Sequence, residues 1–173
     1  MKKLTTLYKG RFLRLLDKDG WEYASRSNAT GVVVLLAVTD QDELVLVEQF
    51  RPPVGSTVIE LPAGLVGDLD DREESVLDAA ERELLEETGY RAGHVSILMS
   101  CPSSAGMSDE IVTFILAKKL RKVAAGGGDS SENITVHVVP RAGVSDWIAA
   151  KQAKGVPVDP KIFSALYWLS SER

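Results

Sequence analysis

The sequence predicts a single α/β domain, and three features of its hydrophobic pattern indicate that class. Residues 31–38 form a continuous apolar run, which is typical of a strand buried on both faces. Residues 76–88 repeat apolar positions at helical spacing, and residues 162–169 carry a wider apolar face that predicts a core helix. With 173 residues, 45% of them hydrophobic and 26% charged, the chain is long enough for one substantial core.

The first part of the chain, residues 1–29, predicts a small antiparallel sheet. Its three strands are expected at 4–8, 11–16 and 21–26, with turns at Lys9-Gly10 and at Asp17–Gly20. Such a module buries little apolar surface alone. We therefore expect it to pack on the core, residues 30–173, or on a second copy of the chain, within one domain that spans residues 1–173.

The core alternates further strands with helices. After the buried run, strands are expected at 43–50, 94–100, 111–117 and 134–139, and helices at 144–154 and after Asp159-Pro160, where the aspartate caps the helix. A loop of small residues, 101–110, separates two of these strands and ends in two acids. A segment with three successive glycines, 124–129, is expected to be mobile.

The helix at 76–88 has clear local signals at both ends. Ser75 is placed to cap its N-terminus with Asp78 as the partner three residues on, and Gly89 suits the left-handed residue that ends a helix. The expected apolar stripe consists of Val76, Leu77, Ala80 and Leu84. Glu83 and Glu87 stack one turn apart on another face, because four residues advance the helix by about one turn.

Acidic residues crowd the C-terminal end of this helix. Glu83, Glu86 and Glu87 repel one another and face the negative end of the helix dipole, while Arg82 can pair with Glu86. A divalent cation such as Mg²⁺ or Mn²⁺ would remove this conflict, since clustered carboxylates suit its oxygen ligand shell. A solvated acidic face is the structural alternative.

The helix carries a motif that resembles the signature of the Nudix hydrolases. Residues 82–90 read Arg-Glu-Leu-Leu-Glu-Glu-Thr-Gly-Tyr, and Glu74 precedes Arg82 with the family's seven intervening residues. The glycine that normally begins the signature departs from the pattern. Gly64 is its natural match within Leu61–Gly64, Gly67 is the alternative, and either choice requires a longer loop before Glu74.

This resemblance implies an α/β/α sandwich with a mixed sheet, accompanied here by the small N-terminal antiparallel sheet. It also implies Mg²⁺ or Mn²⁺ as cofactor. The expected metal ligands are the Ala63 carbonyl and Glu83, Glu86, Glu87 and Glu132. Arg82 is expected to hold the carboxylates in register. Glu132 or Glu86 would act as the base on water, with Glu110 as a third candidate, and an exposed structural acid is the alternative for Glu132.

Further strings are similar to the branch of the family that hydrolyses ADP-ribose and nucleoside diphosphate sugars. Residues 48–52 and 60–64 carry this similarity, which implies that Arg51 binds substrate phosphate and that Glu60 belongs to the substrate pocket. Loop 101–110 resembles that branch's substrate loop, but Ala105 stands where proline is usual. The expected substrate contacts are Arg51, Glu60, Trp21, Ala105, Gly106 and Glu110. Ordinary surface or core roles remain open for Arg51, Glu110 and Trp21.

The expected function is hydrolysis of a nucleoside diphosphate sugar, such as ADP-ribose, to a nucleoside monophosphate and a sugar phosphate. The alternatives are another nucleotide substrate (a dinucleoside polyphosphate, a nucleoside triphosphate or coenzyme A) or a module that senses nucleotide sugars without cleaving them. A formal charge of −5 argues against a nucleic-acid partner. The absence of a long apolar run and the single Cys101 predict a cytoplasmic protein that does not bind membranes. The resemblance also implies a homodimer.

Overall fold

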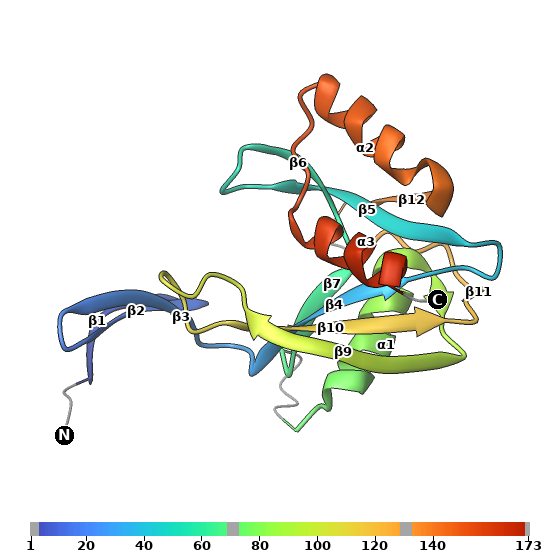
Figure 1. Ribbon diagram of the computed structural model, residues 1–173. Helices are drawn as coiled ribbons and strands as arrows, with labels where there is room; N and C mark the ends of the chain where they lie inside the picture. Colours follow the sequence, from blue (N-terminus) through green and yellow to red (C-terminus); the bar gives the residue numbers. More distant parts are fainter. Residues whose placement is uncertain (1–3, 69–72, 129–132, 172–173) are drawn as a thin grey trace.

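The structure is a computed structural model that describes residues 4–68, 73–128 and 133–171 (Figure 1). Its central sheet has the order β7-β4-β10-β9, and the bounds are Ala63–Val66, Gly31–Ala37, Ile111–Lys118 and His94–Pro102. The β4 and β10 strands are parallel while the other two pairings are antiparallel, so the sheet is mixed, as predicted.

A second, antiparallel sheet has the order β12-β5-β6, with bounds Thr135–Pro140, Glu43–Arg51 and Ser56–Glu60. The short strands β8 (Tyr90–Arg91) and β11 (Arg121–Lys122) pair with each other. The helices are α1 (Val76–Thr88), α2 (Val144–Ala153) and α3 (Lys161–Ser171), with a short 3₁₀ turn, η1 (Arg141–Gly143), before α2.

Helices cover both sides of the sheets, and the alternation of strand side chains creates two cores. Val33 and Leu35 of β4 pack in a cluster that includes Leu84 of α1. Their neighbours Val34 and Leu36 point the other way, into a cluster formed with side chains of both C-terminal helices: Val144, Ile148, Ile162, Ala165 and Leu169. Figure 1 shows α1 on one side of the central sheet and α2 and α3 on the other, which confirms the α/β/α sandwich.

The first three strands form an arm that extends from this sandwich (Figure 1). They are β1 (Leu4–Lys9), β2 (Leu13–Lys18) and β3 (Trp21–Arg26), paired antiparallel in the order β1-β2-β3 as predicted. The arm is tied to the loop between β9 and β10, since the Ala24 amide donates to the Met107 carbonyl at 2.8 Å. Every described residue of β1 is exposed. Within the described ranges, no helix is long and apolar enough to cross a membrane.

The sequence failed to predict β6 and β7. Both are short, at five and four residues, and Leu61-Pro62 lies between them, so the stretch from Glu60 onward reads as an apolar turn. Strand β7 forms because the edge of β4 is available to it, with Val34 opposite Ala63. This long-range pairing brings Ala63 and Gly64 to α1.

Candidate functional site

Helix α1 begins and ends where its local signals predicted. The Ser75 hydroxyl oxygen accepts a hydrogen bond from the Asp78 amide at 3.1 Å, and Gly89 takes the left-handed conformation with φ of 69°. The apolar stripe is rotated from the expected one. Leu77 is 36% exposed, whereas Ala79 joins Ala80 and Leu84 in the core.

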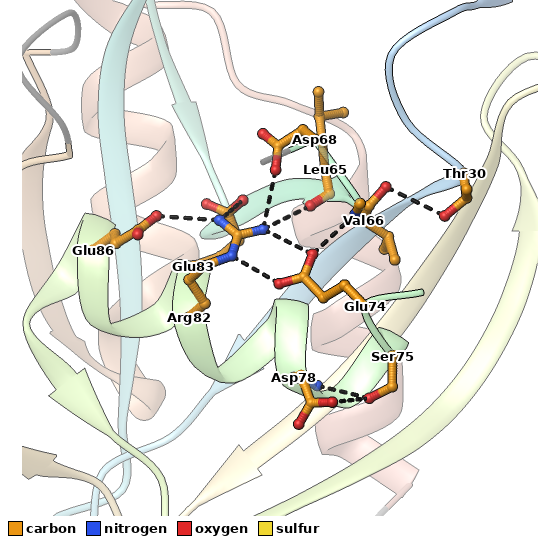
Figure 2. Close-up of polar contacts among 11 residues, drawn as sticks. Thr30, Leu65, Val66, Asp68, Glu74, Ser75, Asp78, Arg82, Glu83 and Glu86 are labelled. Carbon is orange, nitrogen blue, oxygen red and sulfur yellow. Dashed lines mark hydrogen bonds and ion pairs between the residues drawn. The ribbon is translucent and has the colours of Figure 1, made fainter. Parts of the chain in front are cut away.

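Arg82 of α1 is the centre of an ion-pair network (Figure 2). Its Nε donates to Glu74 Oε1 at 2.8 Å, and its Nη1 donates to Glu83 Oε1 at 2.8 Å and to Glu86 Oε2 at 3.2 Å. Its Nη2 contacts the Leu65 carbonyl at 3.0 Å and Asp68 Oδ1 at 3.3 Å. One guanidinium therefore orients carboxylates from the helix and from the preceding loop.

The electrostatics of this network differ from one carboxylate to the next. Hydrogen bonding to Arg82 is the main cause that lowers the pKa of Glu74, helped by a hydrogen bond from the Gly67 amide. Glu74 in turn raises the pKa of Arg82, so that guanidinium stays charged. Burial raises the pKa of Glu83 to about 7, although Arg82 opposes the shift.

Glu83 fits beside β7 because residue 64 is a glycine and has no side chain. A Cβ atom at residue 64 would overlap Cδ and Oε1 of Glu83, so a side chain there would displace this carboxylate. Gly67 has φ of 74° and contributes its amide to Glu74 instead. The two glycines considered for the start of the signature thus serve two different carboxylates, and Gly64 is the one that contacts the helix.

The carboxylates fit a divalent cation by donor type, and two of them are buried. Glu83 and Glu87 are 8% and 2% exposed, so two acids are buried close together with oxygen ligands available. In the described part of the chain, no three Asp, Glu, His or Cys side chains lie close enough to form a metal-binding group. Glu86 is turned toward Arg82, and Glu87 Oε2 accepts the Ala63 amide at 3.0 Å.

A cavity of about 480 Å³ brings most of the predicted site residues together. Those that line it are Arg51, Ala63, Arg82, Glu83, Glu86, Glu87 and Glu110. A larger cavity of about 610 Å³ lies at the opposite end of β4 and β10, but it contains none of the predicted residues. The 480 Å³ cavity is therefore the candidate site, and its volume suits a small-molecule ligand.

Two arginines that line this cavity, from different strands, are each held by a glutamate. Arg51 at the end of β5 pairs with Glu60 at 2.6 Å, which places Glu60 beside the cavity. Arg26 at the end of β3 pairs with Glu110 at 2.9 Å. Arg26 was not predicted from the sequence, and neither was Asp68, which lines the cavity beside Arg82. Arg26 ends β3 just as Arg51 ends β5, and this position at a strand end is the sequence feature that could have identified it.

The remaining predicted substrate residues lie at the arm. The Trp21 indole donates to the Gly106 carbonyl at 3.3 Å, and Trp21 is 63% exposed. Neither these two residues nor Ala105 line the 480 Å³ cavity, and their substrate contacts stay predictions. Glu132 lies outside the described residues.

Comparison with known proteins identifies the family. The NUDIX domain profile matches residues 28–166. A methanol dehydrogenase activator of Bacillus methanolicus is 38% identical over 103 residues, 59% of this chain and 54% of that protein. An ADP-ribose pyrophosphatase of Bacillus subtilis (strain 168) is 41% identical over 90 residues, 52% of this chain and 46% of that protein.

The chain thus spans about half the length of these relatives. A crystal structure of an ADP compounds hydrolase shares the fold with a TM-score of 0.74 at 22% identity, over 97% of this chain and 90% of that one. The profile match covers α1 with its carboxylates, both sheets of the sandwich and most of α3. The chain belongs to the NUDIX family.

Proposed function

We propose that the protein is a metal-dependent pyrophosphohydrolase that cleaves the diphosphate of a nucleoside diphosphate sugar, with ADP-ribose as the reference substrate. The observation that carries the proposal is one cavity that combines buried carboxylates of α1 with Arg26 and Arg51. A diphosphate needs both, because cations neutralise its charge and arginines bind phosphate bidentately. The similarity to the ADP-ribose pyrophosphatase of Bacillus subtilis supports this substrate class.

The carboxylate end of the cavity would hold Mg²⁺ or Mn²⁺. Its proposed ligands are Glu83, Glu86, Glu87 and the Ala63 carbonyl, with Glu132 as a further ligand from outside the described residues. A bound ion would offset the negative charge of the diphosphate and lower the pKa of an attacking water. Arg82 would keep Glu83 and Glu86 in place through the bonds it already makes, rather than contact substrate.

The two paired arginines of the cavity would bind the substrate's phosphates. Glu60 orients Arg51 and Glu110 orients Arg26, so each guanidinium is preorganised before substrate arrives. The proposed base is Glu132 or Glu86. Glu86 lines the cavity and its side chain is 45% exposed, which leaves it accessible to a water molecule.

The N-terminal arm is proposed to contribute to substrate binding and to dimerisation. Trp21 is proposed to stack on the substrate base, with Ala105 and Gly106 of the neighbouring loop close to it. Stacking by an exposed aromatic ring suits a flat base. We further propose that the protein is a cytoplasmic homodimer in which the arm contributes to the interface.

The experiment is monophosphate release from ADP-ribose, ADP-glucose, GDP-mannose, UDP-glucose, diadenosine polyphosphates and dGTP, each with Mg²⁺, with Mn²⁺ and with EDTA. Metal-dependent cleavage of a nucleotide sugar is expected. Cleavage of dGTP or diadenosine polyphosphates alone would replace the substrate class. Binding of a nucleotide sugar without turnover would identify a sensor instead.

A second test replaces Glu86, a proposed metal ligand and base, whose exposed side chain can be changed with little effect on the fold. Glu86→Gln keeps the size of the side chain and is expected to reduce turnover by roughly 10²–10⁴-fold. Its thermal melting should match that of the unaltered protein. A variant that no longer melts cooperatively would show that Glu86 serves the fold rather than the site.

A further inference from the structure

The C-terminal end of α1 is capped by a lysine from a later part of the chain, which binds one of its last carbonyls. Lys122 lies on β11, and its ammonium donates to the Thr88 carbonyl at 2.6 Å and to the Ala125 carbonyl at 3.0 Å. The same nitrogen lies 4.9 Å from the centre of the Tyr90 ring. This one charge therefore joins the helix end, strand β8 and the segment that follows β11.

That segment, residues 123–128, docks on the end of the helix. The Gly127 amide donates to the Glu87 carbonyl at 2.8 Å, and the Gly128 amide donates to the Glu86 carbonyl at 3.1 Å. A Cβ at Gly126, whose φ is 75°, would lie 2.5 Å from the Thr88 carbonyl carbon. The successive glycines predict a mobile loop here, but amides of residues 124–128 bond to carbonyls that a helix end leaves open.

Lys122 also supplies a charge that the helix itself does not provide. The last turn of α1, which the structure describes in full, has no basic residue, and Glu86 and Glu87 lie within it. Acidic side chains at the negative end of a helix dipole destabilise that end. An ammonium bound to the Thr88 carbonyl, one residue after Glu87, offsets this destabilisation.

From this geometry we propose that Lys122 is a positioning residue for the metal site. It fixes the backbone of the last turn of α1, which carries Glu86 and Glu87, two of the proposed ligands of the divalent cation. The inference rests on the proposed function, because it concerns the same carboxylates. Lys122 acts through the Thr88 and Ala125 carbonyls and contacts neither substrate nor metal.

Lys122→Met should have two opposing effects on the affinity for the cation, so the sign of the measured change shows which effect dominates. Loss of a positive charge near an acidic site would by itself favour binding of a cation. Loss of the contacts to Thr88 and Ala125 would free the helix end and weaken binding. We expect the second effect to dominate, because ligand geometry is set by such supporting contacts.

The test is Mn²⁺ affinity measured by electron paramagnetic resonance, together with turnover of ADP-ribose. Lys122→Met is expected to weaken Mn²⁺ binding by about tenfold and to lower kcat more than it raises KM. Lys122→Arg, which keeps the charge and the donors, should recover most of the affinity. Lys119→Met is the matched control, since it removes the same charge from the turn between β10 and β11.

Amide hydrogen exchange provides a readout that needs no metal. In Lys122→Met the amides of Gly127 and Gly128 should exchange faster by about tenfold, because local opening governs their protection. Lys119→Met should leave them unchanged. Lys122 is exposed, so its replacement leaves no buried cavity, and cooperative melting of each variant confirms that it folds.

The outcomes separate this inference from the proposed function. Mn²⁺ affinity that is unchanged or tighter in Lys122→Met would overturn it, even with faster amide exchange, because Lys122 would then be only a structural contact. Weaker Mn²⁺ binding would support it even if no nucleotide sugar were hydrolysed, in which case only the proposed activity fails. A protein that binds no Mn²⁺ would overturn both.

Discussion

Gly64 is the residue at which a missing side chain matters most for the site. It brings β7 against α1 so closely that Glu83 occupies the space a Cβ would need. The sequence left the role of this glycine open, because its spacing to Glu74 departs from the family pattern. The contact with Glu83 shows that Gly64 is the glycine that packs against α1. Sequence spacing alone could not reveal this contact.

Gly64→Ala is therefore expected to displace Glu83. Metal affinity should fall by roughly 10- to 100-fold, and the free energy of unfolding should fall by roughly 1–3 kcal/mol because the contact is overpacked. Mn²⁺ titration and thermal melting measure the two effects. Gly143→Ala is the control, since no described heavy atom lies within 4 Å of a Cβ there. Equal Mn²⁺ affinity in both variants would contradict the role of Gly64.

Glu83 predicts a definite pH dependence in the metal-free protein. Burial raises its pKa from 4.5 to about 7, so the folded state retains a proton that the unfolded state loses. Its contribution to stability is full below pH 4.5 and is lost as the pH rises through about 7. A metal must displace this proton, so Mn²⁺ affinity should increase from pH 6 to pH 8. Calorimetry in buffers of different ionisation enthalpy would detect the released proton.

Glu83→Gln removes the titrating group. It should therefore flatten the pH dependence of stability without metal and the pH dependence of Mn²⁺ affinity. Thermal melting without metal at pH 5 and pH 7.5 provides the comparison. If the variant kept the full pH dependence of Mn²⁺ binding, another acid would be responsible for it.

Elements with signals inside their own residues were predicted well from the sequence. Helix α1 has a cap at Ser75 and another at Gly89, and both lie where expected. Strands β6 and β7 depend instead on pairing with β5 and β4, and their few residues give no such signal. The site follows the same rule. The carboxylates of α1 were found from one motif, whereas Arg26 enters the cavity only through the packing of the arm.

A polar contact joins the second sheet to α2. Glu48 of β5 accepts a hydrogen bond from Lys151 of α2 at 2.7 Å and contacts His137 of β12 at 2.9 Å. The ring of Trp147 lies 5.0 Å from Lys151 Nζ and 5.0 Å from the centre of the His137 ring. Glu48 thus links β5, β12 and α2 through side chains that are only 20–22% exposed.

Glu48→Gln is expected to lower the free energy of unfolding at pH 7 by roughly 1–3 kcal/mol. Hydrogen bonding to Lys151 is the main cause that lowers the pKa of Glu48 below 4.5. Its contribution to stability is present above pH 4.5 and is lost as the pH falls through the lower folded-state pKa. Urea unfolding at pH 7 and at pH 3 measures this contribution. The difference in the free energy of unfolding between the variant and the unaltered protein should be smaller at pH 3. The exposed Glu81→Gln variant should show no such difference.

At the scale of the whole molecule, the arm leaves apolar side chains without cover. Leu4, Tyr8 and Phe12 are 58%, 65% and 51% exposed, and they lie on one extension of the molecule (Figure 1). Exposed apolar surface gathered in this way marks an interaction site more often than scattered single residues do. A three-stranded sheet that buries so little apolar surface also gains little stability on its own. A second copy of the chain is the partner implied by the proposed homodimer.

Tyr8→Glu combined with Phe12→Glu should therefore convert a dimer to a monomer, because burial of two charges in an apolar interface is unfavourable. Sedimentation velocity measures the state directly. Phe163→Glu provides the control, since this ring on α3 is equally exposed at 50% but lies outside the arm. If dimerisation positions Trp21 against the substrate base, the arm variant should also raise KM while Phe163→Glu leaves it unchanged. An arm variant that remains dimeric would place the interface elsewhere, and the exposed residues of the arm would then need a different partner.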